Sequence, residues 1–267
     1  MRSGTWRLLA LATAITLAGL GAAGCGKGCG CGKETATLSG RVLDAMDSDP
    51  LNESSVAVDG DLVYTNEDGE FSFEDLEPGT VHFAAGNDGY YTYETDIVLE
   101  GGDDFERDFP IVPESNHWEY RFILWWGEEP ADLDAHLWVP IGLREGDHVY
   151  SGNLGSLTEE PYASLVLNDM TGCGPEIVTI RQNNPGGWPV TYYDGEFVFA
   201  VRHNAGGSTI PASGARIEIY HEDDLIETIE APTGSPQQGW YWYVGTLNCG
   251  TGAWTLVNTY SEDPPGM

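Results

Sequence analysis

Two carboxylates and an imidazole stand at every second position of the segment PADLDAHLWVP, residues 130–140. They are Asp132, Asp134 and His136. Because side chains alternate across a β-strand, these groups and Trp138 should share one face, while the apolar residues between them form a core face. Two like charges about 7 Å apart are unfavourable unless a cation, an arginine or donated hydrogen bonds compensate them. The row therefore predicts a partner for its negative charge.

A second polar pair ends the segment ASLVLND just before a glycine-rich turn. Oxygen ligands from two strand ends are a common way for sandwich domains to hold Ca²⁺. We therefore predict that a Ca²⁺ site forms between the two pairs, from Asp132, Asp134, Asn168 and Asp169. The structural alternative is that the carboxylates cap turn N–H groups or pair with an arginine, for which the candidates are Arg121, Arg181 and Arg202.

Catalytic patterns are weak in this chain. His136, His148 and His203 fall on separate segments and no H-E-x-x-H motif is present, so a zinc enzyme is not predicted. No G-x-S-x-G nucleophile motif is present either. We expect a protein that is not an enzyme.

The segment GWYWYVG, residues 239–245, concentrates aromatic side chains. Trp240 and Trp242 should share one face of a strand, with Tyr241 and Tyr243 on the other. An exposed pair could stack on sugar rings or anchor a protein partner, which makes Trp240 and Trp242 candidate ligand-binding residues. The alternative is that both faces are covered, within a sandwich or by another domain.

The first 24 residues read as a secretory leader. Arg2 and Arg7 precede an apolar run, residues 8–20, that is too short to anchor a helix in a bilayer. The ending Ala-Ala-Gly-Cys resembles the bacterial lipobox, which implies cleavage after residue 24 and acylation of Cys25. Palmitate and a second acyl group would hold the chain stably at a membrane. Gly26 replaces the Asp that signals inner-membrane retention, which favours the outer membrane; an ordinary cleaved signal peptide is the alternative.

The remaining chain is acidic. The formal net charge of the whole sequence is −32, and no lysine follows Lys33. Such a surface repels nucleic acid and anionic head groups and attracts cations. We expect no nucleic-acid partner, and a bulk charge that serves mainly solubility.

The cysteines divide into three groups. Cys25 is assigned to lipid, and Cys29 and Cys31 lie in a Gly/Cys-rich tether, residues 25–34. Export favours oxidation, so Cys173 and Cys249 are predicted to form a disulfide. Two separate buried thiols are the alternative.

The elements that must position these residues are short strands. Turn signals such as Asp59-Gly60 and Asp68-Gly69 interrupt alternating segments, and no helical period longer than two turns occurs. Tryptophan is absent between residues 25 and 117 but frequent afterwards, with prolines at the junction. We predict an all-β protein with two β-sandwich domains in tandem, residues 35–113 and 117–262, the second with ten strand candidates.

Two resemblances accompany this pattern. The series SGRVLDA, NEDGEFSF, LEPGT and DGYY, spread over residues 36–112, resembles the carboxypeptidase regulatory-like domain, a transthyretin-like and generally non-catalytic sandwich. WGEEPADLDAHLWVP, LVLNDMTGCGPEIVTI and SGARIEIY are similar to an uncharacterised bacterial envelope β-domain with the motif W-G-x-x-P-x-D-L-D-x-H-L. Together they predict an envelope lipoprotein that acts as a non-catalytic binding or structural module. An envelope protein or a glycan is the expected partner, and a carbohydrate-binding module is the competing function.

Overall fold

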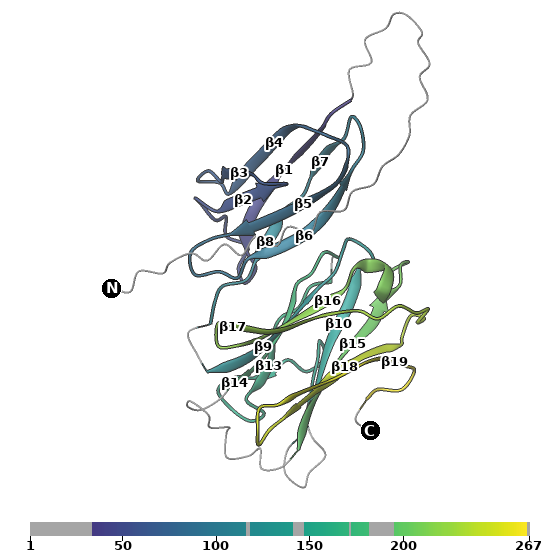
Figure 1. Ribbon diagram of the computed structural model, residues 1–267. Coiled ribbons are helices and arrows are strands. Elements are labelled where there is room, and N and C mark those ends of the chain that lie inside the picture. The colour runs from purple at the N-terminus through teal and green to yellow at the C-terminus, as the bar shows by residue number, and fades with distance from the viewer. Residues whose placement is uncertain (1–33, 116–117, 141–146, 171, 182–194, 266–267) are drawn as a thin grey trace, which may run out of the picture.

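The computed structural model describes most of the chain after the predicted leader and tether. The described residues form two β-sandwiches in tandem, which confirms the predicted all-β fold (Figure 1). Within them, no helix has the length and apolar character needed to cross a membrane. The predicted signal peptide and the three cysteines up to Cys31 lie outside the described ranges, which are 34–115, 118–140, 147–170, 172–181 and 195–265.

The first domain is a sandwich of two four-stranded sheets. One has the order β4-β1-β7, with β8 pairing the later part of β1, and the other has the order β3-β2-β5-β6. The strands are β1 (Ala36–Asp44), β2 (Ser55–Val58), β3 (Asp61–Tyr64), β4 (Glu70–Leu76), β5 (Gly79–Gly86), β6 (Tyr93–Leu99), β7 (Asp104–Glu106) and β8 (Phe109–Ile111).

Alternation and turn chemistry build this sandwich. Asp59 and Gly60, both with positive φ, close the two-residue hairpin between β2 and β3, as predicted. Along β4, Phe71 and Phe73 point inward while the residues between them are exposed. The core between the sheets includes the stacked rings of Phe83 and Phe109, with centroids 4.0 Å apart.

The second domain is a larger sandwich. Its sheets have the orders β11-β10-β15-β18-β19 and β12-β13-β14-β9-β16-β17, with the short 3-10 helix η1 (Ile210–Ser213) between β15 and β16. Each of the ten predicted segments coincides with a strand, and β12 is an addition. The strands are β9 (Glu119–Trp125), β10 (Asp132–Val139), β11 (Asp147–Val149), β12 (Gly155–Ser156), β13 (Ala163–Leu167), β14 (Glu176–Arg181), β15 (Glu196–Ala205), β16 (Arg216–His221), β17 (Asp224–Glu230), β18 (Tyr241–Asn248) and β19 (Trp254–Ser261).

The two domains share an apolar core at their junction. The inner faces of the second sandwich enclose one cluster, but the outer face of its β9, β14 and β16 carries a second apolar surface. Ile123, Trp125, Ile177 and Tyr220 on that surface are buried in the same cluster as the core of the first domain. Tyr220 stacks on Tyr91 of the first domain with ring centroids 3.9 Å apart.

Polar groups tie the connecting segment to β9. Arg121 donates from Nη1 to the carbonyl oxygen of Pro113 at 2.6 Å, and the Ser115 hydroxyl donates to Oε1 of Glu119 at 2.6 Å. Glu119 is buried and also receives hydrogen bonds from Arg121 and Arg181. The junction is therefore held by packing and by a buried polar network.

Candidate functional site

Strand β10 carries the acidic row on the face predicted from alternation. Its apolar residues, from Leu133 to Val139, belong to the core of the second sandwich. Asp132, Asp134 and His136 lie on the opposite face, yet they are only 8%, 4% and 3% exposed. Strand β10 is therefore buried on both faces, so neighbouring side chains cover the charges of Asp132 and Asp134.

An imidazole pair covers the middle of this face. Nδ1 of His136 and Nε2 of His148 are 2.8 Å apart, so one of the two nitrogens donates to the other. The ring of His148 stacks on Trp138 and on Tyr150, each with centroids 4.4 Å away. Burial, followed by His148 and Arg202, lowers the pKa of His136 to about 3, so the imidazole is neutral at physiological pH.

Arg202 lies on the strand next to the acidic row. It pairs with Asp134 in the register of β10 and β15, and its guanidinium carbon lies 5.8 Å from the centroid of the Tyr241 ring. Burial and then Asp132 raise the pKa of Asp134, while a hydrogen bond from Ser151 and the charge of Arg202 act against the rise. Of the three arginines predicted as partners, only Arg202 acts on the pKa of Asp134, which it lowers. Arg121 and Arg181 form ion pairs with Glu119 instead.

Glu176 is the acidic residue that sequence reasoning missed. It begins β14, is 0% exposed, and accepts a hydrogen bond on Oε2 from the backbone N–H of Ala135 at 2.6 Å. Burial raises the pKa of Glu176 well above its usual value, and the charges of Asp134, Asp132 and Asp169 raise it further. Both predicted acidic pairs are therefore within electrostatic reach of this one carboxyl group.

The predicted Ca²⁺ ligands are placed at one end of the second sandwich. Asp132 and Asp134 lie on β10, and Asn168 and Asp169 directly follow β13. Among the described residues, however, no three His, Cys, Asp or Glu side chains already surround a point that could hold a metal ion. The four-residue Ca²⁺ site stays a prediction.

The ligand-binding role predicted for Trp242 is wrong. Its side chain is 0% exposed within the core of the second domain, and its Nε1 donates to Oδ1 of Asn258 at 2.8 Å. Trp240 precedes β18 and is half-buried. Tyr241 and Tyr243 are the pair on the outer face, and the edge of Tyr241 meets the ring of His136. Alternation identified the two faces but not which one lies inside.

The predicted disulfide between Cys173 and Cys249 is absent from the structure. The N–H of Cys249 bonds to Gly195, near the end of β10, whereas that of Cys173 bonds to Gly127, near its start. An eight-residue strand spans about 25 Å, while the Cα atoms of a disulfide must lie within about 7 Å. The distance between the two positions therefore excludes a disulfide between Cys173 and Cys249 in this fold.

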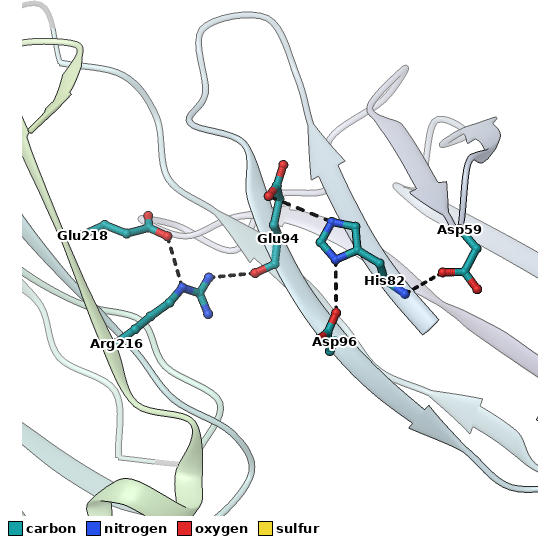
Figure 2. A network of polar contacts seen from close by, with 6 residues as sticks. All are labelled: Asp59, His82, Glu94, Asp96, Arg216 and Glu218. Carbon is teal, nitrogen blue, oxygen red and sulfur yellow. Dashed lines mark hydrogen bonds and ion pairs between the residues drawn. The ribbon is translucent and has the colours of Figure 1, made fainter. Parts of the chain in front are cut away.

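A groove of about 760 Å³ lies between the two domains. In Figure 2, Arg216 of β16 reaches across it and donates from Nη2 to the carbonyl oxygen of Glu94 on β6 at 2.8 Å. The Nε of Arg216 donates to Glu218 at 3.2 Å, and Nδ1 of His82 lies 3.1 Å from Asp96. Arg216 and His82, the basic side chains of the groove lining, therefore already have hydrogen-bond partners within the protein.

The lining of the groove is acidic and aromatic. Glu218 is nearly buried, where it also accepts a hydrogen bond from the indole N–H of Trp125 at 3.0 Å. Burial, followed by Asp223 and Asp88, raises the pKa of Glu114. The carboxylates of the lining exceed its cations: they are Glu94, Asp96, Glu114, Glu218 and Glu230. The groove therefore favours a positively charged ligand.

Two β-sandwiches that share an apolar cluster at their junction define a tandem β-module. Residues 37–112, which form the first sandwich, match the family described as Carboxypeptidase regulatory-like domain. The match covers less than half of the chain and leaves the second domain unassigned. No curated protein matches the chain.

Two solved structures match the chain at low similarity. A proposed carbohydrate-binding protein from Bacteroides uniformis is 14% identical, with coverage of 75% of this chain and 97% of that one and a TM-score of 0.26. The major pilin subunit of Bacillus cereus is 9% identical, with coverage of 73% and 68% and a TM-score of 0.27. At such scores, neither likeness carries an inference about this chain.

Proposed function

We propose that the chain is a non-catalytic binding protein of the bacterial cell envelope, anchored to the outer membrane through acylated Cys25, and that it binds a basic segment of another envelope protein. The observation that carries the binding role is the acidic groove between two domains that share one apolar core. Ligand sites occur preferentially at domain interfaces, and a rigid interface holds its lining groups in place without an ordering cost. The anchor is supported by the leader sequence.

Charge identifies the class of ligand. Glu94 and Asp96 are well exposed, and the groove holds more carboxylates than cations. Opposite charge speeds association and gives specificity for a basic segment. The competing glycan function loses its proposed platform because Trp242 is buried.

The test of binding uses a fluorescent basic peptide. The double variant Glu114→Gln, Glu230→Gln should bind it at least tenfold more weakly than wild type, because it removes two negative charges from the groove lining. The matched control, Glu74→Gln with Glu100→Gln, removes two exposed charges of the first domain outside the groove. Equal weakening in both variants would mean non-specific attraction, and selective binding on a glycan array without peptide binding would favour the carbohydrate function.

The anchor has its own test. Cys25→Ser should move the protein from the membrane fraction to the soluble fraction and leave the leader uncleaved, because lipobox cleavage follows acylation. Unchanged processing and fractionation would contradict the lipoprotein assignment.

A further inference from the structure

Three buried side-chain oxygens at one end of the second sandwich have no hydrogen-bond partner. They are Oδ1 of Asp132, Oδ1 of Asn168 and Oε1 of Glu176. Asp132 is 8% exposed and Glu176 is 0% exposed. A buried acceptor without a donor is costly, and more so when it belongs to a carboxylate. Three such atoms in one region indicate a shared ligand.

Strand register brings Asn168 and Glu176 toward each other, and the charge of Asp132 acts on Glu176. Leu167 pairs with Ile177 across β13 and β14, so the next residue, Asn168, lies opposite Glu176 on the same face. Glu176 in turn reaches the edge of β10 through its hydrogen bond from the N–H of Ala135. Its side chain therefore lies between Asn168 and the acidic row that begins at Asp132.

The described side chains supply little positive charge to this cluster. None of the described ion pairs includes Asp132, Asp134 or Glu176, and the arginines on β9, β14 and β16 of the other sheet are bound to Glu119 and Glu218. Arg202 lies beside Asp134, and the buried imidazole of His203 feels the charge of Asp132. Asp132 receives one hydrogen bond, on Oδ2 from the amide of Asn204 at 2.6 Å. The excess negative charge is left for an external cation.

We propose that Asp132, Asn168 and Glu176 bind a Ca²⁺ ion. An all-oxygen set of two carboxylates and an amide suits a hard cation, and Ca²⁺ tolerates irregular oxygen geometry better than Mg²⁺ does. A set that includes an amide oxygen is also compatible with the lack of a three-residue His, Cys, Asp and Glu group among the described residues. The site goes beyond the proposed groove and does not depend on the lipid anchor.

The test is calorimetric titration of the purified full chain with CaCl₂ and, separately, MgCl₂, together with melting curves in chelator and in each salt. We expect saturable one-to-one binding of Ca²⁺, with a rise in melting temperature that is larger than with Mg²⁺. Glu176→Gln keeps an acceptor for the Ala135 N–H but removes the charge, so it should weaken Ca²⁺ binding at least tenfold. Asp132→Asn is the second variant, and Glu196→Gln, an exposed carboxylate of the same domain, is the control.

The melting temperature in chelator shows whether a variant has lost a Ca²⁺ ligand or has lost stability of the fold itself. In chelator, Glu176→Gln should melt at or above the temperature of wild type, because it removes a buried charge, and only wild type and Glu196→Gln should gain from Ca²⁺. The proposed site is contradicted if either Glu176→Gln or Asp132→Asn keeps the full rise in melting temperature with Ca²⁺. It is also contradicted if Ca²⁺ and Mg²⁺ raise the melting temperature equally. Failure of this test would leave the groove and the anchor untouched.

Discussion

At the scale of single residues, burial keeps His136 neutral. Its pKa is lowered to about 3, whereas an imidazole in an unfolded chain titrates near 6.5. Between these values the unfolded chain binds more protons than the folded one, so stability is greatest above about pH 6.5 and is lost as the pH falls. The loss from this one group is at most about 1.4 kcal/mol per pH unit.

His136→Phe should therefore flatten the acid limb of the stability curve. The phenyl ring can occupy the aromatic surroundings of Trp138 and Tyr150 without taking up a proton. Urea unfolding at a series of pH values between 4 and 7 measures the slope. His82→Gln changes an exposed imidazole of the first domain and serves as control; if it flattens the curve as much as His136→Phe does, the assignment to His136 is wrong.

At the scale of elements, strand β18 depends on Trp242. Its indole fills the core and bonds to Asn258 of the neighbouring strand β19. Trp242→Ala should lower the free energy of unfolding by about 3–5 kcal/mol, because it removes a large buried side chain and leaves a cavity. Leu256→Ala on β19 truncates a side chain that is 48% exposed and should cost about 0.5 kcal/mol or less. Denaturant midpoints compare the two, and equal costs would contradict the placement of Trp242.

Several strands of the second domain were predictable because polar and apolar residues alternate along them, as in β10. The same local chemistry predicted the hairpin at Asp59-Gly60. Asp68-Gly69 also reads as a hairpin signal, but its turn connects β3 and β4 in different sheets, with Asn66 accepting from the N–H groups of Asp68 and Glu70. Local sequence thus predicts a turn, while the sheet in which the next strand lies depends on the packing of distant segments.

The site was predictable only in part for the same reason. The period of two placed Asp132, Asp134 and His136 on one face, but nothing in a single strand says which face is covered. Glu176 follows the cis Gly174-Pro175 bond on the other sheet, so its approach to β10 arises from the way the two sheets stack. The Gly-Pro-Glu sequence inside the second resemblance was the signal that could have indicated it.

At the scale of the whole molecule, the shared core should make the domains unfold together. Calorimetry of wild type should show one transition, with equal calorimetric and van't Hoff enthalpies. Trp125 is 2% exposed in the junction cluster, where it packs on Tyr93 and donates to Glu218. Trp125→Ala should separate the trace into two transitions. Trp242→Ala serves as control, because it weakens the second domain away from the junction and should shift the transition without dividing it; two transitions in wild type would refute the coupling.

The place of β1 within its sheet also has a mechanical consequence. The N-terminal segment joins the fold at Ala36, and β1 is held on one side by β4 and on the other by β7 and β8. A pull on that segment acts along the strand, so the ladders on both sides bear the load together in shear. Hydrogen bonds loaded in this way must fail collectively, whereas those of an edge hairpin open one after another. A pull that enters at β1 is therefore opposed by both ladders at once, and we expect it to be passed to the rest of the protein before the first domain unravels.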